Sequence, residues 1–333
     1  MNFLDCLSRL ATSNDISDIH FHQDKETLIR VSGDIVQSHV SFAPTKQVFD
    51  AFIQTNLDET QLKYFEEKGD FDFAISLDDF RFRVSVAKAN EGYVMVCRKL
   101  SSHIPNVSDL SLPPAVVDTT NYENGLVLVT GPTGSGKSTT LASLISAINK
   151  TRAVNILTIE DPIEFIHKRE KGAVFQRQIG RDTSSFSQAL RAALREDPDV
   201  ILVGEMRDLE TISLALTAAE TGHLVFGTLH TNGGASTINR IIDAFPPEQQ
   251  NQIRTQLGHS LKLVVTQQLH KRKDDQGRVA SFEVMRVTTA IANLIRENKI
   301  HQINNTMSVG AQDGMLTMEK SIQALVAQGL IDG

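Results

Sequence analysis

Residues 131–138 read Gly-Pro-Thr-Gly-Ser-Gly-Lys-Ser, and this segment restricts the fold more than any other feature of the chain. An apolar, β-favouring run at 126–130 precedes it. The apolar residues that follow recur at 141, 144, 145 and 148, which is the spacing of one helical face. Strand, loop and helix in this order, with the pattern G-x-x-x-x-G-K-[ST], are typical of a phosphate-binding loop. The sequence therefore predicts an α/β fold that binds a nucleotide at this loop.

The groups of this segment suit a nucleoside triphosphate and its metal ion. The glycines permit positive φ angles, so that successive N–H groups can point at a phosphate. Lys137 supplies a positive charge for the β- and γ-phosphates, and the Ser138 hydroxyl can reach Mg²⁺. We therefore expect ATP and Mg²⁺ as ligands. The residues expected to contact the nucleotide are Gly131, Thr133, Gly134, Ser135, Gly136, Lys137, Ser138 and Thr139.

The composition favours a two-domain cytoplasmic protein and argues against several other classes. The chain has 333 residues, more than a single domain usually contains, and 41% of them are hydrophobic. A formal net charge of −7 without a broad basic surface argues against nucleic acid as a partner. Cys6 and Cys97 are too few for a four-cysteine zinc site, and no run approaches 18 apolar residues.

Residues 1–100 are predicted to form a small α+β domain. A helical pattern covers 45–68, and strand patterns lie at 19–21, 28–31, 71–74, 81–87 and 93–98. Serine, proline and asparagine accumulate between 101 and 115, which predicts a linker. Residues 116–333 then form the second domain.

The second domain is predicted to contain a parallel sheet. Strand patterns at 155–159, 200–203 and 224–229 alternate with helical patterns near 184–195 and 209–221. This alternation places a ligand at the carboxyl ends of the strands. A hairpin is predicted from 263–269 and 279–285, and the chain from 288 onward is predicted to be helical.

Carboxylates follow two of these predicted strands. Glu205 comes directly after 200–203, where nucleotide hydrolysis requires an acid for Mg²⁺ and its water shell. Glu160, Asp161 and Glu164 follow 155–159. One of the three is expected to orient or deprotonate the attacking water, and the others cap the turn or pair with arginines. The spacing alone does not choose among them.

Histidines and arginines complete the candidate residues. His223 and His230 bracket the strand at 224–229, so only His230 is expected at the nucleotide end, where an imidazole can sense the γ-phosphate. His223 is expected to be structural. Three arginines lie on predicted strands of the first domain and are either ordinary surface residues or guanidinium groups directed at ATP from another domain or subunit. They are Arg81, Arg83 and Arg98.

Together these blocks resemble the secretion ATPases of type II secretion and type IV pili, and most closely the PilT-type twitching-motility ATPases. The resemblance covers nearly the whole chain. The matching blocks are 17–20, 29–34, 131–138, an Asp box at 158–165, 194–199 running into 204–208, and a His box from 221–223 to 229–232.

The resemblance implies a PAS-like N-terminal domain, a RecA-like P-loop NTPase domain, and a hexameric ring with ATP between the two domains. It implies that Glu164 acts on the attacking water, that Glu205 serves as an atypical Walker B residue, and that His230 monitors the γ-phosphate. The three arginines match the family's arginines directed at ATP. The implied activity is ATP hydrolysis that drives pilus retraction. The implied partners are an inner-membrane platform protein, with peripheral attachment at the pilus base, and a companion retraction ATPase.

Two departures from the family pattern stand out. Residues 290–297 read Ala-Ile-Ala-Asn-Leu-Ile-Arg-Glu, with Ala292 where the retraction ATPases carry an arginine. We expect altered motor output from this change. Gly233 and Gly234 follow the His box, where small polar residues or alanine are more usual, so a change in loop flexibility is expected.

Three alternative functions fit the sequence less well. A pilus assembly or type II secretion ATPase usually carries a longer N-terminal region and four zinc-binding cysteines. A RecA-like nucleic-acid translocase is disfavoured by the acidic balance. A nucleotide-binding regulator without turnover is disfavoured by the presence of Lys137, Glu164 and Glu205 together.

Overall fold

The computed structural model describes residues 1–13, 16–31, 33–78, 80–100, 103–274 and 277–332. They form two compact units. We call Met1–His103 together with Pro162–Ile166 the N-terminal unit, and Ile104–Asp161 together with His167–Gly333 the C-terminal unit. Each unit is described by itself.

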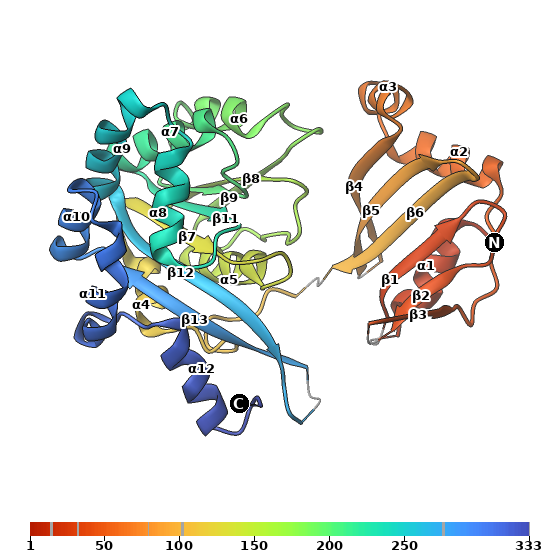
Figure 1. The fold of residues 1–333 in the computed structure, drawn as a ribbon. Helices are drawn as coiled ribbons and strands as arrows, with labels where there is room; N and C mark the ends of the chain where they lie inside the picture. The colour runs from red at the N-terminus through yellow and green to blue at the C-terminus, as the bar shows by residue number, and fades with distance from the viewer. Residues whose placement is uncertain (14–15, 32, 79, 101–102, 275–276, 333) are drawn as a thin grey trace. The chain divides into compact units, whose positions relative to one another are not determined.

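The N-terminal unit is an antiparallel sheet with three helices (Figure 1). The sheet order is β3-β2-β1-β6-β5-β4. Phenylalanines fill its core: Phe3 of α1 lies edge-on to Phe21 and Phe49, and all three are buried. The elements are α1 (Phe3–Ala11), β1 (Ile16–His22), β2 (Leu28–Val31), β3 (Asp34–Gln37), α2 (Lys46–Asn56), α3 (Glu59–Lys68), β4 (Asp70–Leu77), β5 (Phe80–Ala89) and β6 (Gly92–Leu100).

The predicted strands of this unit are all present, but the helices differ from prediction. Residues 45–68 form two helices, because Leu57 is extended and Asp58 begins α3 with a capping box. In that box, Asp58 Oδ1 accepts from the Gln61 N–H at 2.9 Å. The pattern analysis also missed α1, which Asn2 caps through the Asp5 N–H, and the exposed edge strand β3.

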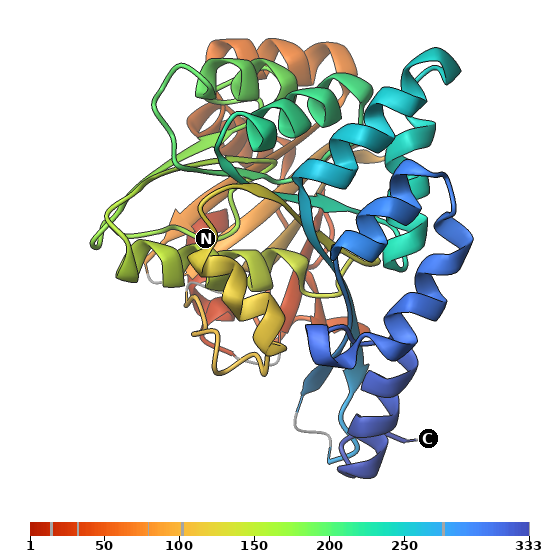
Figure 2. The same cartoon turned by 90° about the vertical axis from the view of Figure 1, so that its left-hand side faces the viewer.

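The C-terminal unit is a seven-stranded sheet in the order β13-β12-β7-β11-β10-β8-β9. The sheet is parallel except for the β12–β13 hairpin, as the sequence predicts. Both Figures 1 and 2 show α12 running beside this hairpin. The elements are α4 (Pro114–Val117), β7 (Gly125–Thr130), α5 (Lys137–Thr151), β8 (Asn155–Glu160), β9 (Ala173–Gln178), α6 (Phe186–Ala193), β10 (Val200–Val203), α7 (Leu209–Glu220), β11 (Leu224–Leu229), α8 (Gly234–Asp243), α9 (Pro247–Ser260), β12 (Leu261–Lys271), β13 (Arg278–Arg286), α10 (Thr289–Arg296), α11 (Ile303–Val309) and α12 (Met318–Ala327).

The centre of the sheet is buried on both faces, so successive residues of β7 pack into two different apolar clusters, one on each face. Leu126 and Leu128 pack in one apolar cluster, with residues of α6, α7 and α8. Val127 and Val129 pack in the other, with residues of α5. This burial explains why the central strands β7, β10 and β11 are buried along their whole length rather than alternating between buried and exposed residues. No helix of the described residues has the length and apolarity needed to cross a membrane.

The predicted domains 1–100 and 116–333, with a linker at 101–115, stay a prediction, and the compact units are a separate division of the chain. Residues 104–115 of the predicted linker belong to the C-terminal unit, and Leu112 among them is buried in the same core cluster as Leu144 of α5. Positions 101 and 102 lie outside the described residues. The segment Pro162–Ile166 groups with the N-terminal unit although it follows β8 in the chain.

Candidate nucleotide-binding site

The glycine-rich segment forms a loop between β7 and the N-terminus of α5. Gly131, Gly134 and Gly136 have φ angles of 134°, 78° and 91°, in the positive region that the sequence predicts. At Gly131 the surrounding structure also excludes a side chain, because a Cβ there would lie 2.3 Å from the carbonyl oxygen of Gln267 on β12. The loop is therefore held against the neighbouring strand by backbone contact.

Polar groups of the loop converge at the start of α5, where the helix dipole favours an anion. Lys137 Nζ donates to the carbonyl oxygens of Gly131, at 2.8 Å, and Pro132, at 3.0 Å, so its positive charge lies at the loop. Ser138 is exposed in the first turn of the helix. The hydroxyl of Ser135 is buried without a hydrogen-bond partner among the described residues. This arrangement suits the phosphates of a nucleotide.

Glu205 follows β10 and is held between two basic side chains. Arg207 Nε lies 2.6 Å from Glu205 Oε1, and His230 Nε2 lies 3.2 Å from the same oxygen. The Glu205 side chain is 19% exposed, against 70% for Arg207. Burial raises the pKa of the Glu205 carboxyl, but the hydrogen bonds and charge of Arg207 and His230 outweigh it, so the pKa lies below its usual range. The carboxylate is therefore ionised at neutral pH.

The two histidines that bracket β11 lie at opposite ends of this strand, as expected. His230 follows the carboxyl end and faces Glu205 of the neighbouring segment. His223 precedes the strand, and its Nδ1 lies 2.9 Å from the carbonyl oxygen of Ala218 at the end of α7. That contact fits the structural role predicted for His223.

The three carboxylates after β8 have different surroundings. Glu160 Oε1 accepts from Thr158 Oγ1 at 2.6 Å and from Gln176 Nε2 at 3.1 Å, which ties β8 to β9. Glu164 is half-buried and belongs to the segment that groups with the N-terminal unit, whereas Asp161 belongs to the C-terminal unit. Glu160 thus accepts hydrogen bonds from two neutral side chains, and the expectation that two of the three acids cap the turn or pair with arginines stays a prediction.

The three candidate arginines lie on one face of the N-terminal sheet. Arg81 and Arg83 are two residues apart on β5, and Arg98 on β6 is the register partner of Arg83. Arg81 donates through Nε and Nη2 to the carbonyl oxygen of Ile163, at 3.2 and 2.9 Å, next to Glu164. This bond fixes the segment that carries Glu164.

Acidic partners hold the other two arginines. Arg83 Nη2 lies 2.6 Å from Asp72 Oδ2, and Arg98 Nε lies 2.8 Å from Asp18 Oδ1. Burial raises the pKa of Asp18, but hydrogen bonds from Arg98 and Ser17 and the charge of Arg98 bring it below its usual range. Arg81, besides its bonds to the Ile163 carbonyl oxygen, donates through Nη1 to Ser76 Oγ at 3.3 Å.

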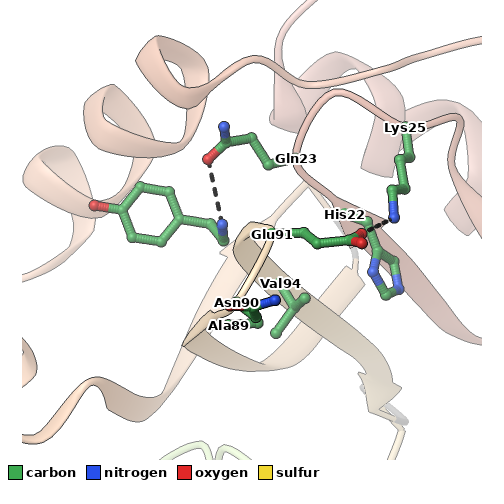
Figure 3. Close-up of a pocket in the computed structure, with 8 residues that line it drawn as sticks. His22, Gln23, Lys25, Ala89, Asn90, Glu91 and Val94 are labelled. Atoms are coloured by element: carbon green, nitrogen blue, oxygen red, sulfur yellow. Dashed lines mark hydrogen bonds and ion pairs between the residues drawn. The ribbon is translucent and has the colours of Figure 1, made fainter.

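A cavity of about 330 Å³ in the N-terminal unit has no connection with the candidate residues. It lies at the turns that join β1 to β2 and β5 to β6 (Figure 3), and four of its lining residues pair with one another. Lys25 and Glu91 form an ion pair, and the Tyr93 N–H donates to Gln23 Oε1 at 3.3 Å. We assign it no ligand.

The sequence analysis missed Arg207 as a member of the site. Arg207 belongs to the quoted block 204–208, and its position two residues after the strand-end acid was an available signal. The contact of Thr228 with the Gly204 carbonyl oxygen, just before Glu205, was not predictable in this way because it joins β11 to β10.

Comparison with known proteins agrees with this geometry. The type II/IV secretion system protein family matches residues 2–332. The chain is 48% identical over 316 residues to the type IV pilus retractation ATPase PilT of Pseudomonas aeruginosa, covering 95% of this chain and 91% of that protein. It is also 48% identical over 305 residues to a twitching motility protein of Neisseria gonorrhoeae, covering 91% of this chain and 81% of that protein.

A solved structure matches the described fold. The crystal structure of the pilus retraction motor PilT with bound ADP superposes with a TM-score of 0.90 at 42% sequence identity, covering all of this chain and 95% of that one. A family match across nearly the whole sequence and this similarity in structure lead to one assignment. The chain belongs to the type II/IV secretion system protein family.

Proposed function

We propose that this protein is an ATPase motor that drives retraction of a type IV pilus. The observation that carries the proposal is the ionised Glu205 carboxylate, held by Arg207 and His230 in the same unit as a complete phosphate loop. The relatives named as retraction and twitching-motility proteins support the biological role. The ADP in the related PilT structure supports nucleotide as the ligand.

Each candidate residue has a role in this proposal. The loop N–H groups and Lys137 bind the β- and γ-phosphates, and His230 monitors the γ-phosphate. Ser138 and Glu205 would hold Mg²⁺, and their hard oxygen atoms fit that ion. The bound ion supplies charge neutralisation at the phosphates. Glu164 orients or deprotonates the attacking water.

The N-terminal unit contributes arginines in this proposal. We regard it as a PAS-like domain, because a single antiparallel sheet with helices agrees with that class. Arg81, Arg83 and Arg98 lie on one face of this sheet and would stabilise charge on ATP bound between domains of a RecA-like hexamer. The finer domain ranges, the ring and the shared site belong to the proposal.

The proposed partners follow from the pilus role. An inner-membrane platform protein would receive the motion, with the motor attached peripherally at the cytoplasmic face of the pilus base. Ala292 in α10, where an arginine is usual, is consistent with dependence on a companion retraction ATPase. Ala292 is buried in this structure, so an arginine there would have to displace packed neighbours.

Deletion of the gene tests the proposal directly. If the protein is a retraction motor, the deletion strain is expected to carry as many surface pili as the parent strain, or more, and to show no twitching. Loss of surface pili in the deletion strain would instead indicate an assembly motor. Purified protein without Mg²⁺-dependent ATP hydrolysis would reject the enzymatic part of the proposal.

A further inference from the structure

Two side chains of the β12–β13 hairpin accept hydrogen bonds from consecutive backbone N–H groups in the segment that follows His230. The Gly233 N–H donates to Thr266 Oγ1 at 3.1 Å, and the Gly234 N–H donates to Glu283 Oε1 at 2.7 Å. Thr266 on β12 and Glu283 on β13 are direct register partners in the antiparallel pair. Their side chains therefore share one face and form a two-acceptor clamp at the start of α8.

The double glycine is what permits this close approach. A Cβ at Gly234 would lie 2.7 Å from Met285 Sδ and 3.0 Å from Met285 Cβ. Gly233 has a φ of 108°, and a Cβ there would lie 3.3 Å from Glu283 Oε1. The two glycines thus allow this segment to be anchored on the hairpin, and the change in loop flexibility expected from the sequence stays a prediction.

Thr266 also reaches the strand that leads into the phosphate loop. Its Oγ1 lies 2.8 Å from Thr130 Oγ1, at the last residue of β7 and directly before Gly131. Thr130 and Thr266 are both buried. One buried hydroxyl therefore contacts the base of the phosphate loop and the segment that follows His230. Such a contact can pass a small displacement from the phosphate loop to this segment, because the two hydroxyls lie in a close-packed interior.

We propose that Thr266 and Glu283 are positioning residues for hydrolysis, which hold His230 in a fixed relation to the phosphate loop. The inference rests on the proposed role of His230. Neither side chain touches the nucleotide in this proposal. Removal of either acceptor group is expected to slow ATP turnover, because the segment that follows His230 is then held less firmly. The phosphate loop is expected still to bind nucleotide. Glu283 also supplies the acceptor at the N-terminus of α8, a helix without a side-chain cap of its own.

The test compares isosteric and conservative variants of the full-length protein. Thr266→Val removes the hydroxyl and keeps the shape, whereas Thr266→Ser restores the hydroxyl. Glu283→Ala removes the acceptor, whereas Glu283→Gln keeps an oxygen for the Gly234 N–H. Thr119→Val is a matched control, because Thr119 is also buried and its hydroxyl donates, within the described residues, to the nearby Val116 carbonyl oxygen at 2.6 Å.

The readouts are kcat, KM for ATP, and ADP affinity by titration. Thr266→Val and Glu283→Ala are expected to lower kcat on the order of tenfold, with ADP affinity changed by less than about twofold. Thr266→Ser, Glu283→Gln and Thr119→Val are expected to retain most of the turnover. If both Thr266→Val and Glu283→Ala turn over ATP like wild type, or if they lose ADP affinity as strongly as kcat, the positioning role is wrong.

A double-mutant cycle separates this inference from the role of His230. In a His230→Ala background, Thr266→Val is expected to add little further loss, because the two changes act on one segment. Additive losses would show that Thr266 acts elsewhere and would overturn the inference. Wild-type turnover by His230→Ala alone would reject the proposed role of His230. The inference that Thr266 and Glu283 position His230 would then also be rejected, independently of the results for their own variants. Glu283→Ala keeps the test valid if Thr266→Val does not fold.

Discussion

Glu205 and His230 meet through Oε1 and Nε2 at 3.2 Å, although they follow different strands, β10 and β11. The contact arises because parallel strands bring their carboxyl ends to one edge of the sheet. The carboxylate that we propose for Mg²⁺ and the imidazole that we propose for the γ-phosphate are thus in direct contact. A substitution of one of these residues is therefore expected to change the position of the other side chain.

We predict that Glu205→Ala removes turnover and leaves nucleotide binding largely intact. The loss is expected to be on the order of 10² or more in kcat, because the carboxylate proposed to hold Mg²⁺ and its water shell is removed while the phosphate loop stays unchanged. Steady-state hydrolysis and ADP titration measure the two quantities. Glu210→Ala, an exposed acid in the first turn of α7, is the control. Near-normal hydrolysis by Glu205→Ala would contradict the assignment.

We predict that Arg81→Ala lowers kcat on the order of tenfold or more. Arg81 holds the Ile163 carbonyl oxygen, and Glu164 is the next residue, so the change releases the segment that carries the proposed base. Lys88→Ala changes a basic residue on the same strand whose Nζ donates to the Glu66 carbonyl oxygen at 3.1 Å, and it is expected to behave like wild type. Equal activities of the two variants would argue against any role of Arg81.

We predict that alanine is worse tolerated at Gly131 than at Gly134. Both residues have positive φ, so either substitution strains the backbone by about 1 kcal/mol or more. Only at Gly131 must the new Cβ also displace the Gln267 carbonyl, whereas no atom lies within 4 Å at Gly134. Gly131→Ala is therefore expected to lose ADP affinity and thermal stability together. Comparable melting temperatures of the two variants would contradict this.

We predict a pH-dependent stability contribution from Asp18. Its pKa is lowered in the folded protein, so the stabilisation is present above the ordinary Asp pKa of about 4 and is lost as the pH falls through the lower folded value. Asp18→Asn should cost about 1 to 3 kcal/mol at pH 7, and the difference from wild type should shrink under acidic conditions. Urea unfolding at pH 7 and near pH 3 measures it. A pH-independent difference would show that the carboxylate charge is not responsible.

The sequence predicted the parts of this molecule that depend on neighbours in the chain. β7, the glycine-rich loop and α5 were predictable because each is encoded by a local pattern. The break between α2 and α3 was readable only from the cap at Asp58, which the apolar periodicity conceals. The clamp of Thr266 and Glu283 on Gly233 and Gly234 was not predictable, because it depends on the register of two strands with a third segment.

The position of β7 within the sheet has a consequence for how the unit opens. Every residue of β7 is buried, and the strand is paired on both sides, with β11 and β12. Its amide protons should therefore be among the slowest in the unit to exchange with solvent, whereas those of β9, at the edge of the sheet, should exchange early. The phosphate loop is thus joined directly to one of the strands expected to unfold last in this unit. Partial unfolding at the edge of the sheet can therefore leave a bound nucleotide in place.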